Sequence, residues 1–429
     1  MNQIAATLTV ALTAGLASGQ ATIEFLPPGY VLTGLATGGT TGAGNVTGDL
    51  TFETFRWTST GGTERLGQAT VPVLQVGAGT PDISYDGQSI SASILSTDLL
   101  MTQGVWRSGI GWVETMPPPP ATGQILGVEY GSAWGLSGDG QTVTGFHWGT
   151  VGMSTRARAS KWSESNGMIS LPQNDGRDAR VNAANADGSV VVGWEARPDG
   201  NWRPTAWRDA AKITLEDTLA RCQAAAVNWD GSVIVGSSYD APEFMREAAR
   251  WVWNGGSYDM TLLGVLPGTQ ANFGEAMLTG VSGDGSLGVG WNRYSQGPAS
   301  PITGIVWTPS GGLVNATDFI AGLGLASAFT ADMDIRQLSA VSPDGSAFTG
   351  WVWLSSTGEQ QSFVIHITPP PCTGDANGDR VVNFDDILSV LANFGIAGPP
   401  FVVGDSNGTG TSDFTDIITT LANFNGTCP

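Results

Sequence analysis

The stretch that decides the fold is Ala183-Ala-Asn-Ala-Asp-Gly-Ser-Val-Val-Val-Gly-Trp194, because its pattern returns along most of the chain. Asp-Gly pairs of this kind begin at Asp86, Asp139, Asp187, Asp230, Asp284 and Asp344, and five of the six have a further glycine five residues later. Asp-Gly is typical of the two central residues of a tight hairpin turn, where both need positive φ. Each copy is therefore predicted to be a β-hairpin.

An aromatic residue follows each hairpin at a nearly constant distance, at Trp106, Trp162, Trp207, Trp253, Trp307 and Phe363. A second turn and a further short strand follow these tryptophans, which gives four strands per copy. The aspartates of the Asp-Gly pairs are 53, 48, 43, 54 and 60 residues apart, close to the ~40 to 50 residues of a propeller blade. A degenerate copy lies upstream, with Gly38-Gly39 in place of Asp-Gly. The sequence therefore predicts a mainly β fold, a β-propeller of about seven four-stranded blades, with six or eight as alternatives.

Two continuous apolar runs, Val190-Val-Val192 and Val233-Ile-Val235, lack the alternation of a one-sided sheet. Strands of this kind are buried on both faces, as in stacked blades. The longer connection 316–332 is predicted to contain a helical turn.

The composition limits the class of protein. The chain has 429 residues, of which 41% are hydrophobic and 13% charged, so it has enough apolar material for a large core. Its net charge of −20 repels phosphate and argues against a nucleic-acid ligand. Residues 1–19 form a short apolar run ending in small residues, which predicts a signal peptide and a secreted or cell-surface protein. No later stretch is apolar enough to span a membrane, and we expect a monomer.

The pairing of Val-Ser-x-Asp-Gly-Ser-x-x-x-Gly with a following Phe/Val-x-Trp-x-x-x-Gly-Gly resembles the HAF repeats of bacterial extracellular proteins. The resemblance covers residues 20–368 and implies a secreted β-propeller, but it says almost nothing about the ligand. Residues 369–371 form a brief proline linker. The composition and the repeat period both change there.

The C-terminal segment contains two copies of an oxygen-rich loop. The first has side-chain oxygens at loop positions 1, 3, 5, 9 and 12 and a backbone carbonyl at position 7: Asp375, Asn377, Asp379, Asn383, Asp386 and Val381. The second has Asp405, Asn407, Thr409, Thr411, Asp413 and Asp416. Ca²⁺ takes six to eight oxygen ligands, and this spacing wraps one loop around one ion. An apolar face follows each loop, Ile387, Leu388, Leu391 and Phe394 in one and Ile417, Ile418, Leu421 and Phe424 in the other, which predicts two helices in one small paired domain.

This duplication resembles a type I dockerin over residues 372–429. The resemblance implies two Ca²⁺ sites and a cohesin-like protein or cell-surface scaffold as the partner. The second site should be weaker, because Thr409 replaces an acid at position 5, and Arg380 departs from the glycine usual at position 6 of an EF-hand. Loop positions 10 and 11, Phe384-Asp385 and Phe414-Thr415, would help to contact the partner. The alternative is that the two phenylalanines pack in the domain's own core.

Cys372 and Cys428 bracket this domain, and an exported chain permits a disulfide between them. Closing so long a loop stabilises by roughly 4 kcal/mol in the chain-entropy model. Cys222 is then left over and is expected to be a buried apolar residue.

Candidate catalytic sites are weak. The Gly283–Gly288 segment matches the dinucleotide pattern, but it lies in a strand-turn-strand unit with no helix to receive a pyrophosphate. The two histidines, His147 and His366, define no catalytic arrangement. Glycosidic acid–base chemistry needs two nearby carboxylates, and Glu195, Glu243, Glu247 and Glu275 are the candidates at a propeller mouth. Solvated carboxylates are the simpler interpretation, so no catalytic residue is assigned.

The leading hypothesis is a secreted, non-catalytic binding protein whose propeller presents a recognition surface, tethered through the calcium-ordered module. The alternative is a carbohydrate-active enzyme, a polysaccharide hydrolase or lyase on a propeller scaffold. A third option is a structural component of a surface layer.

Overall fold

The fold is described from a computed structural model. It describes residues 21–47, 53–67, 79–96, 100–115, 130–151, 154–174, 176–216, 221–240, 245–295, 300–367, 373–377, 381–396, 404–407, 409 and 411–425. The chain divides into two compact units with a boundary between Ile367 and Thr368, and each is described by itself. No described helix is long and apolar enough to cross a membrane.

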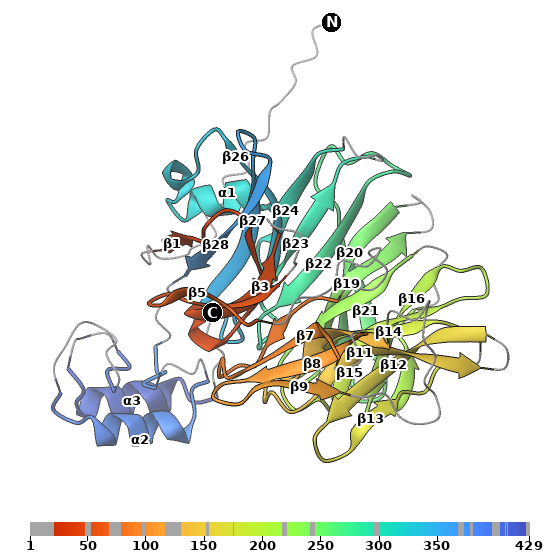
Figure 1. Cartoon of the computed structure of the whole chain (residues 1–429). Helices are drawn as coiled ribbons and strands as arrows, with labels where there is room; N and C mark the ends of the chain where they lie inside the picture. Colours follow the sequence, from red (N-terminus) through yellow and green to blue (C-terminus); the bar gives the residue numbers. More distant parts are fainter. Residues whose placement is uncertain are drawn as a thin grey trace, which may run out of the picture. The chain divides into compact units, whose positions relative to one another are not determined.

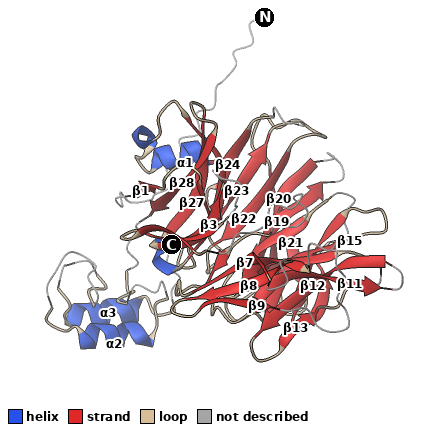
Figure 2. Cartoon of the chain, viewed as in Figure 1, coloured by secondary structure: helices blue, strands red, loops and turns tan. Residues whose placement is uncertain are grey.

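The first unit consists of antiparallel strands in groups of four (Figures 1 and 2). In chain order the groups are β2 (Tyr30–Leu35), β3 (Thr41–Val46), β4 (Thr54–Thr58) and β5 (Gly62–Arg65); β6 (Asp82–Ile83), β7 (Ser89–Leu95), β8 (Met101–Arg107) and β9 (Gly111–Thr115); β10 (Gly131–Leu136), β11 (Val143–Val151), β12 (Ser154–Ser163) and β13 (Gly167–Ser170); β14 (Ala179–Ala184), β15 (Val190–Ala196), β16 (Trp202–Arg208) and β17 (Ala211–Thr214).

The remaining groups are β18 (Gln223–Val227), β19 (Val233–Asp240), β20 (Met245–Trp253) and β21 (Tyr258–Gly264); β22 (Glu275–Val281), β23 (Gly288–Arg293), β24 (Ile302–Thr308) and β25 (Gly312–Asn315); and β26 (Met333–Val341), β27 (Ala347–Leu354) and β28 (Glu359–His366) with β1 (Thr22–Phe25). A single parallel pairing, Arg246 with Glu275, links two of these groups into one eight-stranded sheet. The predicted mainly β fold of four-stranded sheets is confirmed. The last sheet is completed from the other end of the unit, because β1 pairs with β28.

The turn after the first strand of each group differs from the prediction in one respect. The glycine of each Asp-Gly pair has a φ of 70–75°, but none of the six aspartates has positive φ. In the copy at Asp86, the Gly87 amide donates to the Ser84 carbonyl (2.9 Å), so the central residues of the turn are Tyr85 and Asp86. The aspartate instead stabilises the turn through its side chain, which accepts from the Gln88 amide (2.9 Å) and the Ser84 hydroxyl (2.5 Å). Serine or asparagine two residues before the aspartate therefore belongs to the motif.

Neighbouring turns are joined by backbone hydrogen bonds. The amides donate as follows: Thr37 to Tyr85 (2.9 Å), Tyr85 to Gly138 (2.8 Å), Gly138 to Asn185 (3.3 Å), Ala186 to Trp229 (3.0 Å), Trp229 to Gly283 (3.3 Å) and Gly283 to Pro343 (2.7 Å). Pro343 has no amide hydrogen to continue the series. The link between the last copy and the first runs the other way, from the Gly38 amide to the Asp344 carboxylate (3.1 Å). The degenerate Gly38-Gly39 copy thus occupies the place of an Asp-Gly turn.

The core lies between the sheets and is built around third-strand aromatic residues. Trp57, Trp207 and Trp251 are almost completely buried, and burying side chains of this size contributes roughly 1.5–3 kcal/mol each. The strand register shifts the predicted anchor position in two copies, although Phe363 is itself completely buried. In the copy at Asp187, the residue four positions after the aspartate pairs with Trp207. In the copies at Asp230 and Asp344, the equivalent residues pair with Trp251 and Ile365, whereas Trp253 and Phe363 were predicted.

The two apolar runs are buried along their whole length, as predicted: Val190, Val191, Val192, Val233, Ile234 and Val235 are at most 5% exposed. The predicted helical turn is also present, as helix α1 (Ala316–Gly322), whose first turn is capped by the Asn315 side chain. Two 3-10 turns, Thr37–Gly39 and Ala326–Ala328, complete the helical content of the described part of this unit.

The second unit contains helices α2 (Phe384–Ala392) and α3 (Phe414–Ala422). Each begins with a capping box, Asn383 with Asp386 in α2 and Asp413 with Asp416 in α3. The loops before the helices are joined by two matching backbone hydrogen bonds, from the Gly374 amide to the Ser406 carbonyl (2.9 Å) and from the Gly404 amide to the Ala376 carbonyl (2.8 Å). The predicted duplication is therefore visible as two equivalent loop-helix pieces.

Candidate functional site

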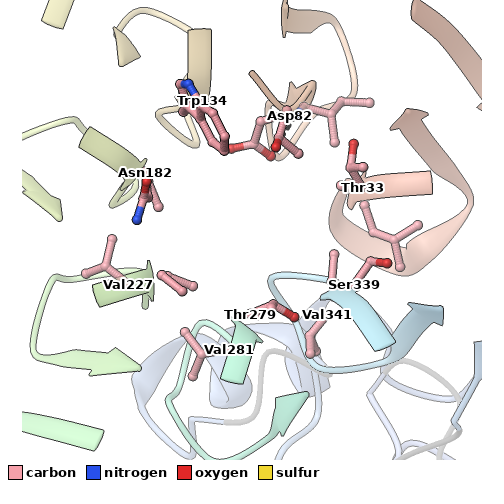
Figure 3. Close-up of a pocket in the computed structure, with 18 of the residues that line it drawn as sticks. Thr33, Asp82, Trp134, Asn182, Val227, Thr279, Val281, Ser339 and Val341 are labelled. Atoms are coloured by element: carbon pink, nitrogen blue, oxygen red, sulfur yellow. Dashed lines mark hydrogen bonds between the residues drawn. The ribbon is translucent and has the colours of Figure 1, made fainter. Parts of the chain in front are cut away.

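A β-bulge recurs at the same place in the first strand of six of the seven four-stranded groups. The pairing with the second strand skips one residue each time, at Thr33, Trp134, Asn182, Ala225, Thr279 and Ser339. A bulge turns the skipped side chain away from the regular alternation of the strand. Figure 3 shows that the labelled members of this set point toward one central space, together with Asp82 of the short strand β6.

This central space is a pocket of about 380 Å³ lined by residues from the first strands of all the sheets. Its volume lies within the range typical of small-ligand sites. The lining changes along the strands. Toward the Asp-Gly turns it is apolar, with Leu136, Val227, Val281 and Val341; the bulged residues form a largely polar middle; and Arg180, Gln223 and Gln337 lie nearer the beginnings of their strands.

Two aromatic side chains meet at the turn end of this pocket. Tyr85 and Trp229 come from the turns of two non-neighbouring sheets, and their rings pack edge to face with centroids 5.9 Å apart. Gly138 and Gly283 leave room for them, since a Cβ at either glycine would lie within 2.6 Å of the Tyr85 or Trp229 ring. A ligand therefore has more open access from the end where the first strands begin.

Arg180 is the main positive charge in the pocket. Its guanidinium lies 3.4 Å from the centre of the Trp134 ring and 5.4 Å from that of Trp194. It donates to the side-chain oxygens of Asn182 (2.8 Å) and Gln223 (3.3 Å), which are neutral. No described carboxylate forms an ion pair with it, and burial lowers its pKa to about 9. An anionic group in the pocket would supply the missing counter-charge.

Asp82 is the acidic group in the pocket. Burial raises its pKa to about 6, although its oxygens accept from the Leu136 amide (3.0 Å) and the Ile83 amide (2.9 Å). The first of these bonds reaches the next sheet. Thr33, Asn182 and Thr279 make similar links, because each donates a side-chain hydrogen bond to a backbone carbonyl of the following sheet. The polar lining therefore both joins the sheets and faces the pocket.

None of the three described glutamates considered for a carboxylate pair, Glu195, Glu247 and Glu275, lines this pocket. The Glu195 carboxylate is fully buried and forms ion pairs with Arg203 (2.6 Å) and Lys212 (3.0 Å). Glu275 is held by Arg246 and Arg293. Glu247 is nearly buried, and Glu243 lies outside the described residues. Glu195 is therefore not the solvated carboxylate that the sequence suggested, because it is buried and ion-paired.

The other predicted features have mixed outcomes. His147 is 1% exposed, and its Nε2 lies 3.3 Å from the Ser170 hydroxyl. Cys222 is buried, as expected. The Gly283–Gly288 segment joins strands β22 and β23 and has no helix after it, as expected. The signal peptide 1–19, the linker 369–371 and Cys372 and Cys428 lie outside the described residues.

The predicted calcium ligands are described except for Asp379. Asp386, at position 12 of the first loop, accepts from the amides of Ala376 (2.8 Å), Asn377 (3.1 Å) and Asn383 (2.8 Å). Asp416 has the same role in the second loop, accepting from the amides of Asn407 (3.0 Å) and Asp413 (2.8 Å). Both carboxylates are completely buried. Each therefore organises its loop even before a cation is considered.

The remaining oxygens of the second loop fit a hard cation only in part. Asp405 is 1% exposed and accepts from the Thr409 amide (3.1 Å). Hydrogen bonds from Thr415 hold the pKa of Asp413 below its ordinary value, while the charge of Asp405 acts in the opposite direction. A cation bound between Asp405 and Asp413 would relieve the repulsion between their carboxylates. The described residues do not, however, bring three acidic, histidine or cysteine side chains into one cluster.

Most of each predicted apolar face of α2 and α3 is exposed, although its first residue, Ile387 or Ile417, is half-buried. Phe384 is 60% and Phe414 63% exposed, and the set Leu388, Leu391, Phe394, Ile418, Leu421 and Phe424 is 41–54% exposed. The side that faces inward carries Asp386 and Val390 in α2 and Asp416 and Thr420 in α3. The alternative in which the two phenylalanines form the core is therefore wrong for the described unit.

No protein-family model matches the chain, and no curated protein matches its sequence. Solved structures of β-propellers are similar to it in outline. TolB from Acinetobacter baumannii is 12% identical with a TM-score of 0.41, over 67% of this chain and 62% of that one. The β-propeller domain of the Trilobed protease from Pyrococcus furiosus is 11% identical with a TM-score of 0.45, over 79% and 95%. A Mycobacterium tuberculosis puromycin-hydrolyzing peptidase is 14% identical with a TM-score of 0.47, over 80% and 53%. These similarities concern the type of fold and carry nothing about ligand or activity.

Sequence reasoning missed the bulged residues and Arg180. A signal for the bulges was available, since the skipped residue lies three positions before the Ser or Asn of the motif, as in Thr279-Gly-Val-Ser282 and Asn182-Ala-Ala-Asn185. For Arg180 there was none, because its closeness to Trp134 depends on the packing of two sheets.

Proposed function

We propose that this chain is an exported, non-catalytic binding protein whose recognition site is the central pocket. The observation that carries the proposal is Arg180, a cation held in a pocket of 380 Å³ among neutral hydrogen-bonding side chains. The scaffold would be a closed propeller of seven HAF-like blades. Its closure is supported by the pairing of β1 with β28 and by the hydrogen bond from Gly38 to Asp344.

A substitution that fills the pocket tests this proposal. Ser339 points into the pocket, so Ser339→Trp should obstruct it without entering the core (Figure 3). The matched control is Ser165→Trp, at an exposed turn. Isothermal titration of the full chain against a panel of plant and algal polysaccharides should find at least one that binds, and Ser339→Trp should abolish that binding while Ser165→Trp retains it. Binding that survives Ser339→Trp, or no binding at all, would refute the pocket as the recognition site.

The second part of the proposal concerns the C-terminal unit as a dockerin-like tether. Asp375, Asn377, Asp379, Val381, Asn383 and Asp386 would hold one Ca²⁺, and Asp405, Asn407, Thr409, Thr411, Asp413 and Asp416 a second, weaker one. The support is the repeated, oxygen-rich loop with a buried carboxylate at position 12 in each copy. Chelation of Ca²⁺ from the full chain should lower the melting temperature of this unit and leave that of residues 21–367 unchanged. A C-terminal unit equally stable with and without chelator would refute the calcium sites.

The exposed apolar faces of α2 and α3 would contact a cohesin-like protein or cell-surface scaffold. Exposed patches of this kind on small domains commonly mark protein interaction sites. Phe384→Ser with Phe414→Ser should abolish binding to type I cohesin modules in the presence of Ca²⁺. A double variant that binds as the parent does would place the contact elsewhere.

One observation favours a second candidate, a polysaccharide hydrolase or lyase. Asp82 lies in the pocket with a pKa of about 6, and a carboxyl group with a raised pKa can act as a general acid or base near neutral pH. Incubation with the same polysaccharides would then release reducing ends or unsaturated products. Release that persists in Asp82→Ala would exclude this role for Asp82.

A further inference from the structure

A series of arginine and tryptophan residues in contact extends from the pocket. We call it the arginine strip: Arg180, Trp194, Trp202, Arg221, Arg246 and Arg293, with Glu275. The Arg180 guanidinium lies over Trp194, which stacks on Trp202 with ring centroids 4.3 Å apart and planes at 9°. Arg221 lies over the other ring of this pair, 5.6 Å from the Trp202 centroid. Stacking of this kind holds a guanidinium in a fixed orientation.

The strip continues across two further sheets. Arg246 donates to the Arg221 carbonyl (2.8 Å) and pairs with Glu275. Arg293 pairs with the same carboxylate at 3.1 Å and lies over Trp291. Contacts therefore connect Arg180, which lines the pocket, to Arg293, at the end of β23.

The strip concentrates positive charge in a chain whose net charge is −20. Two of its four arginines, Arg246 and Arg293, form ion pairs with the Glu275 carboxylate. Among the described residues, no other carboxylate pairs with the strip. Burial lowers the pKa of Arg246, and the charges of Arg293 and Arg221 act in the same direction. Like charges near one another repel, and the single Glu275 carboxylate offsets only part of the four positive charges. The unfavourable arrangement points to a ligand that brings negative charge.

The chemistry of the pocket narrows the kind of anion. The pocket that Arg180 lines also contains side-chain amides and hydroxyls, those of Asn182, Gln337, Thr33 and Ser339. The hydrogens of Asn182 and Thr33 already bond to carbonyl oxygens, which leaves their oxygens as acceptors. Gln337 and Ser339 can both donate to and accept from sugar hydroxyls, whereas the oxygens of a simple polyanion can only accept. Arginine in turn recognises carboxylate and sulfate oxygens with two parallel hydrogen bonds.

We propose that the ligand of the central pocket is an acidic polysaccharide, whose chain end occupies the pocket and whose next residues place their carboxylate or sulfate groups on the arginine strip. This inference rests on the proposed function and names the ligand class of the same site. The strip lies at the beginnings of the first strands, the end left more open by the Tyr85–Trp229 contact.

The test is titration calorimetry of the full chain with three hexasaccharides: an oligogalacturonate (carboxylated), a carrageenan fragment (sulfated) and cellohexaose (neutral). We expect one acidic probe to bind, more weakly at higher salt because the exposed arginines are screened. Which acidic probe binds decides between carboxylate and sulfate. Cellohexaose should bind at least tenfold more weakly.

Arg293→Ser and Arg65→Ser form a matched pair of variants. Both arginines pair with a glutamate, at 3.1 Å and 3.2 Å, and their side chains are 38% and 42% exposed. Removal of one charge-assisted hydrogen bond predicts a loss of about tenfold in affinity for Arg293→Ser. Arg65→Ser, which removes the same charge outside the strip, should bind as the parent does.

The outcomes separate this inference from the proposed function. If a neutral sugar binds as tightly as the acidic probes and Ser339→Trp abolishes this binding, the pocket is the recognition site but the proposal of an acidic ligand is refuted. If polyglutamate binds as well as the acidic sugars, the strip recognises charge alone and the sugar is wrong. If none of the probes binds, the inference is refuted.

Discussion

Asp82 and His147 lie in neighbouring sheets. Burial raises the pKa of Asp82 toward the ordinary value of a histidine and lowers that of His147 toward the ordinary value of an aspartate. That of Asp82 rises to about 6, and that of His147 falls to about 4, with the charge of Arg158 adding to the effect of burial. Asp82 therefore favours folding at low pH and His147 favours it at high pH, over nearly the same interval. Their contributions to the pH dependence of stability should largely cancel in the parent protein.

Replacing Asp82 should expose one half of this balance. Between pH 4 and 6 the folded state holds a proton on Asp82 that the unfolded state has released, so the stability this group contributes is present below pH 4 and lost as the pH rises through 6. The free energy of unfolding of the parent relative to Asp82→Ala should fall by on the order of 3 kcal/mol across this interval. Urea unfolding of both proteins at pH 4 to 7 measures it, and a difference that does not change with pH would contradict the raised pKa.

Replacing His147 should show the opposite trend. Its folded pKa is lowered, so its contribution is present above pH 6.5 and lost as the pH falls toward 4. We expect the stability of the parent relative to His147→Gln to decrease as the pH falls over this interval. The same urea series measures it, and a parallel pH dependence of the two proteins would show that folding does not lower the pKa of His147.

At the scale of secondary structure elements, the repeat could be predicted well because its signals are local. The motif Ser/Asn-x-Asp-Gly determines a turn by hydrogen bonds within six residues, and this turn recurs in six of the seven four-stranded groups. Choices that depend on packing could not be predicted. Trp251 and Trp253 point to the same side of one strand, and only the register with β19 shows which fills the core. Likewise, periodicity showed which residues of α2 share a face, but not that this face is uncovered.

The glycine of the turn offers a test at this scale. Gly188 has positive φ, and a Cβ there would lie 2.6 Å from the Thr142 hydroxyl of the preceding sheet. Gly200 has a similar φ in open space. Gly200→Ala should cost about 1–2 kcal/mol for the backbone alone, and Gly188→Ala roughly 1–3 kcal/mol more for the close contact. Chemical unfolding of both variants measures this, and equal losses would show that the sheets adjust without cost.

At the scale of the whole molecule, charge is distributed unevenly within the first unit. The six turn aspartates lie where the first strands end, and Arg180 lies near the beginning of its strand. The composition could not predict this separation, because a net charge of −20 does not say where the charges lie. The pocket was equally hidden, since its lining is contributed one or two residues at a time by strands far apart in the sequence.

The proposed calcium sites give a prediction at the same scale. Thr409 replaces an acid at position 5 of the second loop, so Thr409→Asp should raise the affinity of that site for Ca²⁺ by about tenfold through an added carboxylate ligand. Thr411→Asp is the control, because position 7 contributes its backbone carbonyl and the new charge would not be a ligand. Calcium titration of the full chain measures both, and equal effects would mean that Thr409 lies outside the coordination shell.

The pairing of β1 with β28 has a consequence for how the protein is made. Residues 22–25 leave the ribosome more than three hundred residues before the strand they join. Until Glu359–His366 has also emerged, residues 22–25 have no strand to pair with. The last sheet therefore cannot be completed, and the sheets made earlier lack this neighbour. This unit can therefore adopt its complete native structure only after residue 366 has been synthesised.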